Sequence, residues 1–247
     1  MKTAKLFLAV CCFLLLASSL IAQSGIFEAR ASRSAATECF VTVVQDTDKL
    51  VYADFETKKD NRPVSSRGGW IQINSNQESP GSPNSYKGMA GVNPPAPDLV
   101  RLSRDSPNKA ATFDYTLLGA NQWAGVGIEI HGQPDKDGTP VPDDVSAYKY
   151  LSLQAYATGV QALRIELTSR GQGLTSNAFP QFNIKVSPGF NTYRIQLKNF
   201  GQPSWADPKL STKDVLKKLT AVSVTAACGP CALISGTVVV DSLIFEN

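Results

Sequence analysis

Short runs in which apolar and polar residues alternate recur from residue 49 to the C-terminus. Segments rich in Gly, Pro, Asn, Asp and Ser separate these runs. Alternation with a period of two places the apolar side chains on one face of a strand, and turn residues between such runs are typical of antiparallel sheets. The pattern therefore predicts an all-β sandwich or barrel, with strands at residues 49–56, 69–73, 99–102, 110–117, 125–131, 150–157, 162–168, 181–186, 191–197, 221–225 and 236–245. Residues 211–219 alone have helical spacing, and we expect surface loops at residues 78–97 and 132–144.

The N-terminus has the pattern of a secretory signal peptide. Lys2 and Lys5 precede an apolar run, and small residues follow near Ala22. This run is shorter than the about 20 apolar residues that a membrane-spanning helix needs. We expect a signal peptide at residues 1–22, a linker or flexible arm at residues 23–45 and one domain at residues 46–247. The mature protein would be secreted or periplasmic, with no membrane span.

The charge of the chain gives no reason to expect a nucleic-acid partner. The formal net charge is +3, and removal of the two lysines of the signal peptide, with no acidic residue, reduces it to +1. Nucleic-acid binding requires a strong basic excess or a basic patch. The composition thus favours other ligands.

Four of the expected strands, at residues 150–157, 162–168, 181–186 and 191–197, carry polar side chains on one side. If these strands belong to one sheet, its outer face is a continuous polar surface that suits sugar hydroxyls. Trp205, in a loop between prolines, would add an exposed ring for the apolar face of a sugar. The other interpretation is the ordinary solvated face of an antiparallel sheet. The candidate ligand-binding residues are Gln154, Tyr156, Arg164, Glu166, Asn183, Arg194 and Trp205.

Several phrases of the sequence follow the order of a known family. They are LVYADFE (50–56), GGW (68–70), WAGVGIEI (123–130), DDVSAYKYLSLQAYATG (143–159), LRIELTS (163–169), FNTYRIQLKNF (190–200), VLKKLTAVSV (215–224) and VVVDSLIF (238–245). In these the chain resembles the family 11 carbohydrate-binding modules of the galactose-binding-domain-like superfamily. The complex I intermediate-associated protein domain is a more distant relative.

The resemblance implies a single jelly-roll β-sandwich of two antiparallel sheets, with a cleft for a β-glucan chain on one sheet. It also implies a structural calcium ion held by acidic residues after the first strand and in the last. Glu56 and Asp241 occupy those places here, and calcium prefers oxygen ligands. The resemblance implies no organic cofactor.

We therefore expect a secreted, non-catalytic domain that binds a polysaccharide or oligosaccharide. A first alternative is an envelope protein that uses the same sandwich for protein–protein interaction or assembly. A second is a glycoside hydrolase, which needs two carboxyl groups about 5 to 9 Å apart; Glu129 and Glu166 are the candidates on strands. We expect Trp70 and Trp123, at strand starts, to lie in the core.

Cys228 and Cys231 form a Cys-Gly-Pro-Cys sequence before the last strand. Redox enzymes place such a pair at the start of a helix, whereas strand residues follow it here. We interpret it as the turn between the last two strands, closed by a Cys228–Cys231 disulfide or with one cysteine bound to Cys39. The single histidine, His131, excludes a zinc site built on several histidines and is expected at the surface.

Overall fold

The structure is a computed structural model that describes residues 48–75, 85–87, 95–119, 121–132, 139–229 and 233–247. The expected signal peptide and linker, Cys39 and Cys231 lie outside these residues. Within the described part, no helix is long and apolar enough to cross a membrane. Residues 48–247 form one compact unit.

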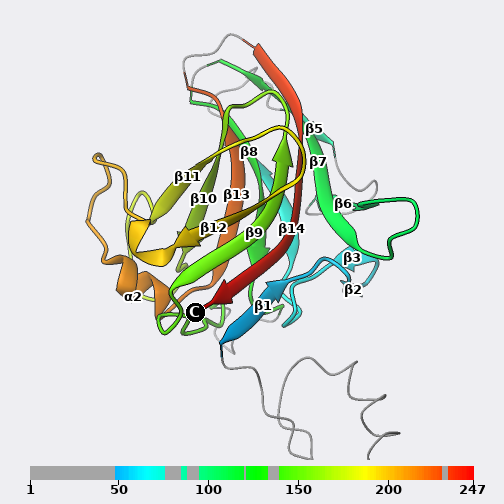
Figure 1. Cartoon of the computed structure of the whole chain (residues 1–247). Helices are drawn as coiled ribbons and strands as arrows, with labels where there is room; N and C mark the ends of the chain where they lie inside the picture. The colour runs from blue at the N-terminus through cyan, green and yellow to red at the C-terminus, as the bar shows by residue number, and fades with distance from the viewer. Residues whose placement is uncertain (1–47, 76–84, 88–94, 120, 133–138, 230–232) are drawn as a thin grey trace, which may run out of the picture. The chain divides into compact units, whose positions relative to one another are not determined.

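Two antiparallel sheets pack face to face (Figure 1). The seven-stranded sheet has the order β12 (Asn191–Gln196), β9 (Tyr150–Ala157), β14 (Leu233–Glu246), β7 (Lys109–Leu118) and β5 (Ser85–Lys87), with β1 (Lys49–Ala53) on β14 and β6 (Asp98–Arg101) on β7. The five-stranded sheet has the order β11 (Gln181–Lys185), β10 (Ala162–Thr168), β13 (Ala221–Ala227), β8 (Trp123–Glu129) and β4 (Ile71–Ser75). A hairpin of β2 (Lys58–Lys59) and β3 (Arg62–Pro63), a 3-10 turn (Leu197–Asn199) and α2 (Thr212–Leu216) complete the domain.

The core lies between the two sheets and comes from the inward side of each alternation. Leu151 and Leu153 of β9 face Leu163 and Ile165 of β10 across the sandwich, and all four are fully buried. Burial of such side chains contributes about 1.5–3 kcal/mol each. The predicted all-β sandwich is confirmed.

All eleven expected strands are present, and those at residues 150–157 and 162–168 have the expected bounds. The short hairpin β2–β3 was not predicted, because two-residue strands show no alternation. The expected loop at 78–97 contains the strand β5. The last strand starts earlier than expected, at Leu233, and the helix is shorter, with Ser211 at its N-cap position.

The expectation that the four polar-faced strands share one sheet is wrong. β9 pairs with β12 in the seven-stranded sheet, whereas β10 pairs with β11 in the five-stranded sheet. Alternation identifies the two sides of each strand but carries no information about which strands pair. The polar side chains therefore lie on two opposite outer faces of the sandwich.

Candidate functional site

The outer face of the five-stranded sheet presents two rows of side chains that cross all five strands. The cross-strand register defines one row as Asn183, Arg164, Thr225, Gly125 and Asn74. The next row is Gln181, Glu166, Ser223, Gly127 and Gln72. In both rows the smallest residues lie on β13 and β8, and longer side chains lie on the strands to either side. This order of sizes shapes a cleft that is deepest over β13 and β8.

The glycines of β8 form the floor of the cleft. A Cβ atom at Gly125 would lie 2.8 Å from the carbonyl oxygen of Val224 and 2.9 Å from the Cα of Thr225. A Cβ atom at Gly127 would lie 2.8 Å from Nδ2 of Asn74. A glycine inside a strand loses packing and conformational entropy. Gly125 thus allows the backbone of β13 to approach closely, and Gly127 leaves out a side chain that an ordinary strand residue would place on this face.

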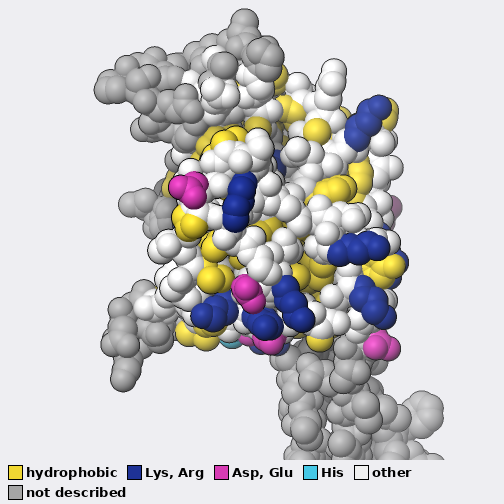
Figure 2. All heavy atoms as spheres, turned by 90° about the vertical axis from the view of Figure 1, so that its left-hand side faces the viewer, with side chains coloured by type: hydrophobic (Ala, Val, Ile, Leu, Met, Phe, Trp, Pro, Cys, Tyr) yellow, Lys and Arg dark blue, Asp and Glu magenta, His cyan; other side chains and the backbone are white. Residues whose placement is uncertain are grey.

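The cavity over this floor has a volume of about 730 Å3. Its walls include Arg164 and Glu166 of β10, Asn74 of β4 and the segment 176–179. Figure 2 shows the side of the molecule on which β11 and β10 lie. The described surface there consists mostly of uncharged polar and backbone atoms, among which charged and apolar side chains are scattered.

Two loops hold one rim of the cleft in place. The backbone N–H of Asp207 donates to Oδ1 of Asn177 at 2.8 Å, and the backbone N–H of Asn177 donates to the carbonyl of Asp207 at 3.2 Å. Nε2 of Gln202 donates to the carbonyl of Ala178 at 2.6 Å. Trp205 lies on this rim and is 64% exposed, which confirms that it is an exposed ring.

The charged groups of the cleft are incompletely paired. Nε of Arg164 is buried and has no hydrogen-bond partner within the described part of the chain. Burial raises the pKa of Glu166, and the guanidinium groups of Arg164 and Arg170 oppose this effect. A buried N–H without an acceptor costs about 1–3 kcal/mol. An oxygen-rich ligand in the cleft would supply that acceptor.

The structure brings together four of the seven predicted binding residues: Arg164, Glu166 and Asn183 lie on the five-stranded face, and Trp205 lies on its rim. Asn183 is in the Arg164 row but is not part of the cavity wall. Gln154, Tyr156 and Arg194 belong to the seven-stranded sheet. These last three do not contribute to the cleft.

Other residues of the cleft were missed or misplaced. Trp123 is half-buried and lines the cleft, so its expected place in the core is wrong. The expectation is also wrong for Trp70, which is half-buried with the Arg62 guanidinium 4.9 Å from its ring centre. Gly125 and Gly127 could have been identified from the sequence, since a Gly-Val-Gly sequence inside a strand marks a close approach of another backbone or a place without a side chain.

Glu129 and Glu166 do not face each other across the cleft. Both lie on the outer face of the five-stranded sheet, and burial raises the pKa of each. β13 separates their strands, and their registers differ by two residues. At about 4.8 Å per strand and 3.4 Å per residue, their backbones are about 12 Å apart. Glu166 lines the cavity, whereas Glu129 is not among its lining residues.

The two residues predicted to bind calcium lie close enough to repel each other. Asp241 is fully buried, and its carboxylate accepts hydrogen bonds from Nδ2 of Asn108 at 2.9 Å and from the N–H of Ser242 at 2.7 Å. Burial raises the pKa of Asp241, and the negative charge of Glu56 raises it further. Oε2 of Glu56 lies 3.5 Å from Nζ of Lys109.

Cys228 directly follows β13 and precedes β14, so its expected place between the last two strands is confirmed. Its pairing stays a prediction, because Cys231 is outside the described residues. His131 is half-buried and not a simple surface residue. Its Nε2 lies 3.1 Å from the carboxylate of Asp143, which also pairs with Arg67 at 2.6 Å.

The fold and the cleft define a β-sandwich domain whose five-stranded sheet has a hollowed polar outer face. No family model matches the sequence, and no curated protein is significantly similar to it. Solved structures share the fold, and two of them are family 11 carbohydrate-binding modules. A family 11 carbohydrate-binding module from Clostridium thermocellum, in complex with a β-1,3-1,4-mixed-linked tetrasaccharide, aligns with a TM-score of 0.51 and 15% identity over 81% of this chain and 96% of that chain.

The family 11 module of the cellulosomal cellulase Lic26A-Cel5E of Clostridium thermocellum aligns with a TM-score of 0.50 and 14% identity. It covers 81% of this chain and 94% of that chain. The predicted resemblance is thus confirmed at the level of the fold. These similarities identify a sandwich like that of family 11 modules.

Proposed function

We propose that this domain binds a polysaccharide in the cleft of the five-stranded sheet and makes no covalent change to it. The observation that carries the proposal is the polar cleft over Gly125 and Gly127 with the exposed ring of Trp205 on its rim. Two similar folds are carbohydrate-binding modules, and one was solved with a β-glucan tetrasaccharide. This likeness supports the ligand class.

The chemistry of the cleft suits a chain of sugars better than a protein surface. Its walls offer amide, hydroxyl, guanidinium and carboxyl groups, which exchange hydrogen bonds with sugar hydroxyls. Protein interfaces use apolar patches of several hundred Å2. The large exposed apolar residues of the described chain come from four separate segments: Val100 and Leu102 at the end of β6, Phe190, Trp205 and Leu233. The assembly-factor alternative gains no support from them.

Affinity electrophoresis of the full chain against soluble β-glucans, mannans and xylans tests the proposal. Arg164→Ala removes a guanidinium from the cleft wall, and Arg194→Ala removes one from the opposite face. We expect Arg164→Ala to weaken retardation by about tenfold, the loss expected for a hydrogen bond to a charged group. Arg194→Ala should bind like the parent protein. Equal loss in both variants, or no retardation of the parent by any glycan, would overturn the proposal.

We also propose a structural calcium ion between Asp241 and Glu56. No Lys, Arg or His of the described chain lies within 4.0 Å of the buried Asp241 carboxylate. Burial and the charge of Glu56 raise the pKa of Asp241, and two neighbouring carboxylates favour a divalent cation. Calcium at 100 times its Kd should add about 2.7 kcal/mol to the unfolding free energy. Urea unfolding with calcium or with a chelator measures this gain, and Asp241→Asn should abolish it; an equal gain in Asp241→Asn would refute the site.

Export of the protein is a third proposal, supported by the sequence of residues 1–22. Expression in a host with a general secretion pathway should give a mature chain that starts near Gln23. N-terminal sequencing and intact mass measure the cleavage. A full-length chain retained inside the cell would contradict export.

A further inference from the structure

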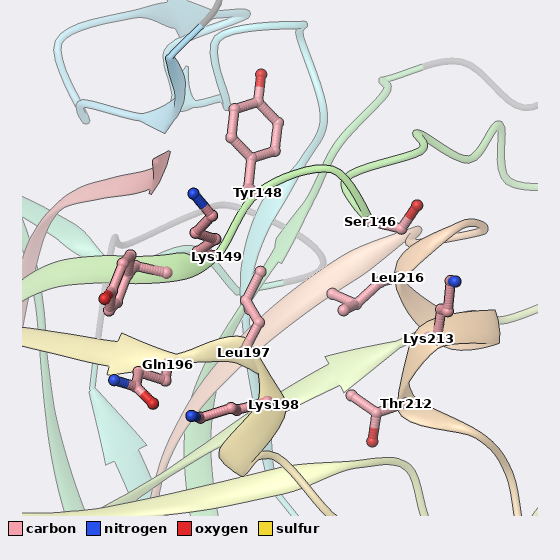
Figure 3. A pocket seen from close by; sticks show the side chains of 10 residues that line it. Ser146, Tyr148, Lys149, Gln196, Leu197, Lys198, Thr212, Lys213 and Leu216 are labelled. Atoms are coloured by element: carbon pink, nitrogen blue, oxygen red, sulfur yellow. The ribbon is translucent and has the colours of Figure 1, made fainter. Parts of the chain in front are cut away.

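A second pocket lies where three segments of the chain meet, at the end of the sandwich beside α2. The segment that enters β9 contributes Ser146 and Lys149, the end of β12 and the 3-10 turn contribute Leu197 and Lys198, and α2 contributes Leu216 and other residues (Figure 3). The pocket has a volume of about 370 Å3. It shares no lining residue with the cleft, so the two are separate sites.

The pocket has an apolar floor. Leu197 and Leu216 point toward each other at the centre of Figure 3, and both are almost fully buried. Tyr148 and Tyr150 also line the pocket, but the Tyr148 side chain points away from the two leucines in Figure 3. The Arg194 guanidinium lies 3.3 Å from the centre of the Tyr150 ring. A flat ligand face of C–H groups would bury apolar area against the two leucines.

Three lysines surround the floor. In Figure 3, Lys149 and Lys198 lie on one side of the two leucines and Lys213 lies on the other. All three are exposed, and none of the pocket's lining residues is acidic. No ion pair of these lysines with a described acidic residue is found.

Acidic residues near the pocket make other contacts. Oδ1 of Asp144 accepts hydrogen bonds from the N–H of Ser146 at 2.9 Å and from its Oγ at 2.7 Å. Oδ1 of Asp214 lies 3.9 Å from Nζ of Lys217. Oε1 of Glu246 accepts hydrogen bonds from Nε of Arg194 and from Oγ of Ser152, each at 2.7 Å. The three lysines therefore have no ion-pair partner among the described residues, and their positive charge favours an anionic ligand.

We propose that this pocket binds a sugar unit that carries a carboxylate, a uronate. The ring would lie on Leu197 and Leu216, while the carboxylate would interact with the lysine ammonium groups. The side chains of Gln196 and Thr212 line the pocket and offer partners for ring hydroxyls. The volume lies at the lower end of the range for small-ligand sites and limits the ligand to a short segment. The proposal does not depend on the function of the cleft.

Titration calorimetry of the full chain with a galacturonic acid trimer, and with the same trimer methyl-esterified at every carboxyl group, tests this inference. We expect the acid to bind and the ester to bind about tenfold more weakly, since three exposed ion pairs are lost. The variant Lys149→Gln/Lys198→Gln/Lys213→Gln should show the same loss toward the acid. The triple variant Lys58→Gln/Arg104→Gln/Lys185→Gln makes the same change in net charge at exposed sites away from the pocket and should bind like the parent protein.

Three results would overturn the proposal. Equal affinity for acid and ester would show that charge is not recognised. Equal loss in both triple variants would show that the general charge of the protein attracts the acid. Loss of acid binding in Arg164→Ala would place the acid in the cleft, whereas retention there would support a second site whatever the cleft binds.

Discussion

The two outer faces of the sandwich arise from the same alternation but have different chemistry. On the seven-stranded face, the polar side chains bind one another. Arg194 donates to Glu246 at 2.7 Å and lies 3.3 Å from the centre of the Tyr150 ring, and Thr237 donates to Asp114 at 2.6 Å. On the five-stranded face, Arg164 retains a buried N–H that has no hydrogen-bond partner among the described residues.

The difference lies in the residues of the middle strands. β8 has glycine at positions 125 and 127 of its outer side, whereas β14 presents Thr237 and Val239 at comparable central positions. Larger side chains cover the backbone and give polar neighbours a place to pair. A missing side chain leaves depth and leaves hydrogen-bonding groups for a ligand. A polar outer face is therefore a candidate site when its polar groups are unpaired and its floor is low.

The largest expected effect is that of filling the floor. Gly127→Val should reduce glycan binding by about a hundredfold, or about 2.7 kcal/mol, because its methyl groups would occupy the deepest part of the cleft. The new Cβ atom meets only the end of the Asn74 side chain, so stability should change by less than about 1 kcal/mol. Affinity electrophoresis and urea unfolding measure the two effects.

Gly201→Ala is the matched control, since a Cβ atom there meets nothing within 4 Å. Gly125 is a poorer test, because a side chain there collides with the backbone of β13 and is expected to cost about 1–3 kcal/mol of stability. If folded Gly127→Val binds the glycan as tightly as the parent protein, the ligand does not lie on the cleft floor.

Removal of the exposed ring should have the next largest effect. Trp205→Ala is expected to weaken binding by roughly thirtyfold, or about 2 kcal/mol, as for an aromatic anchor at an interface. The ring is largely exposed, so stability should be unchanged. Phe190→Ala, which removes another exposed ring before β12, is the control. If both variants lose affinity equally, stacking on Trp205 does not explain binding.

Two carboxyl groups, one on each face, should respond to pH in opposite directions. Burial raises the pKa of Glu166, whereas hydrogen bonds from Ser152 and Arg194 lower the pKa of Glu246. The folded chain therefore holds the Glu166 proton to a higher pH than the unfolded chain, so ionisation of Glu166 costs stability as pH rises above about 4.3. Ionised Glu246 stabilises the fold above that pH, and this contribution is lost as pH falls through its lowered pKa.

Glu166→Gln should therefore raise the unfolding free energy at pH 7, and Glu246→Gln should lower it, each by less than about 1 kcal/mol. Urea unfolding at pH 7 and at pH 3 measures both. The Glu166→Gln gain should disappear at pH 3, where the parent carboxyl is protonated in both states. If both variants change the unfolding free energy at pH 7 in the same direction, the carboxyl groups of the two faces do not have opposite effects on stability.

The sequence predicts the strands and the two sides of each strand because alternation has a local cause. The runs Leu151–Ala157 and Leu163–Thr168 show it clearly, and both strands form with the expected bounds. Strand pairing depends on contacts between distant segments, which no local pattern encodes. For that reason Arg164 and Tyr156 were expected on the same face, but they lie on opposite faces of the sandwich.

The walls of the cleft could be predicted in part from the sequence, but the depth of its floor could not. Arg164, Glu166 and Trp205 stood out by side-chain type, and they line the cavity. The floor did not stand out, because Gly125 and Gly127 act through side chains they lack. The depth appears only when the register sets them beside Ser223 and Thr225.

The smallest expected effect tests the division between the faces most directly. Gln154→Ala and Tyr156→Phe alter two half-buried polar side chains of β9 in the seven-stranded sheet, on the side of the sandwich away from the cleft. Neither change touches a residue that lines the cavity. Binding should therefore stay within about twofold of the parent protein, the range of a surface change of about 0.4 kcal/mol. A tenfold loss of affinity in either variant, measured on the glycan that the parent binds, would mean that the ligand lies on the seven-stranded face and that its internal hydrogen bonds open on binding.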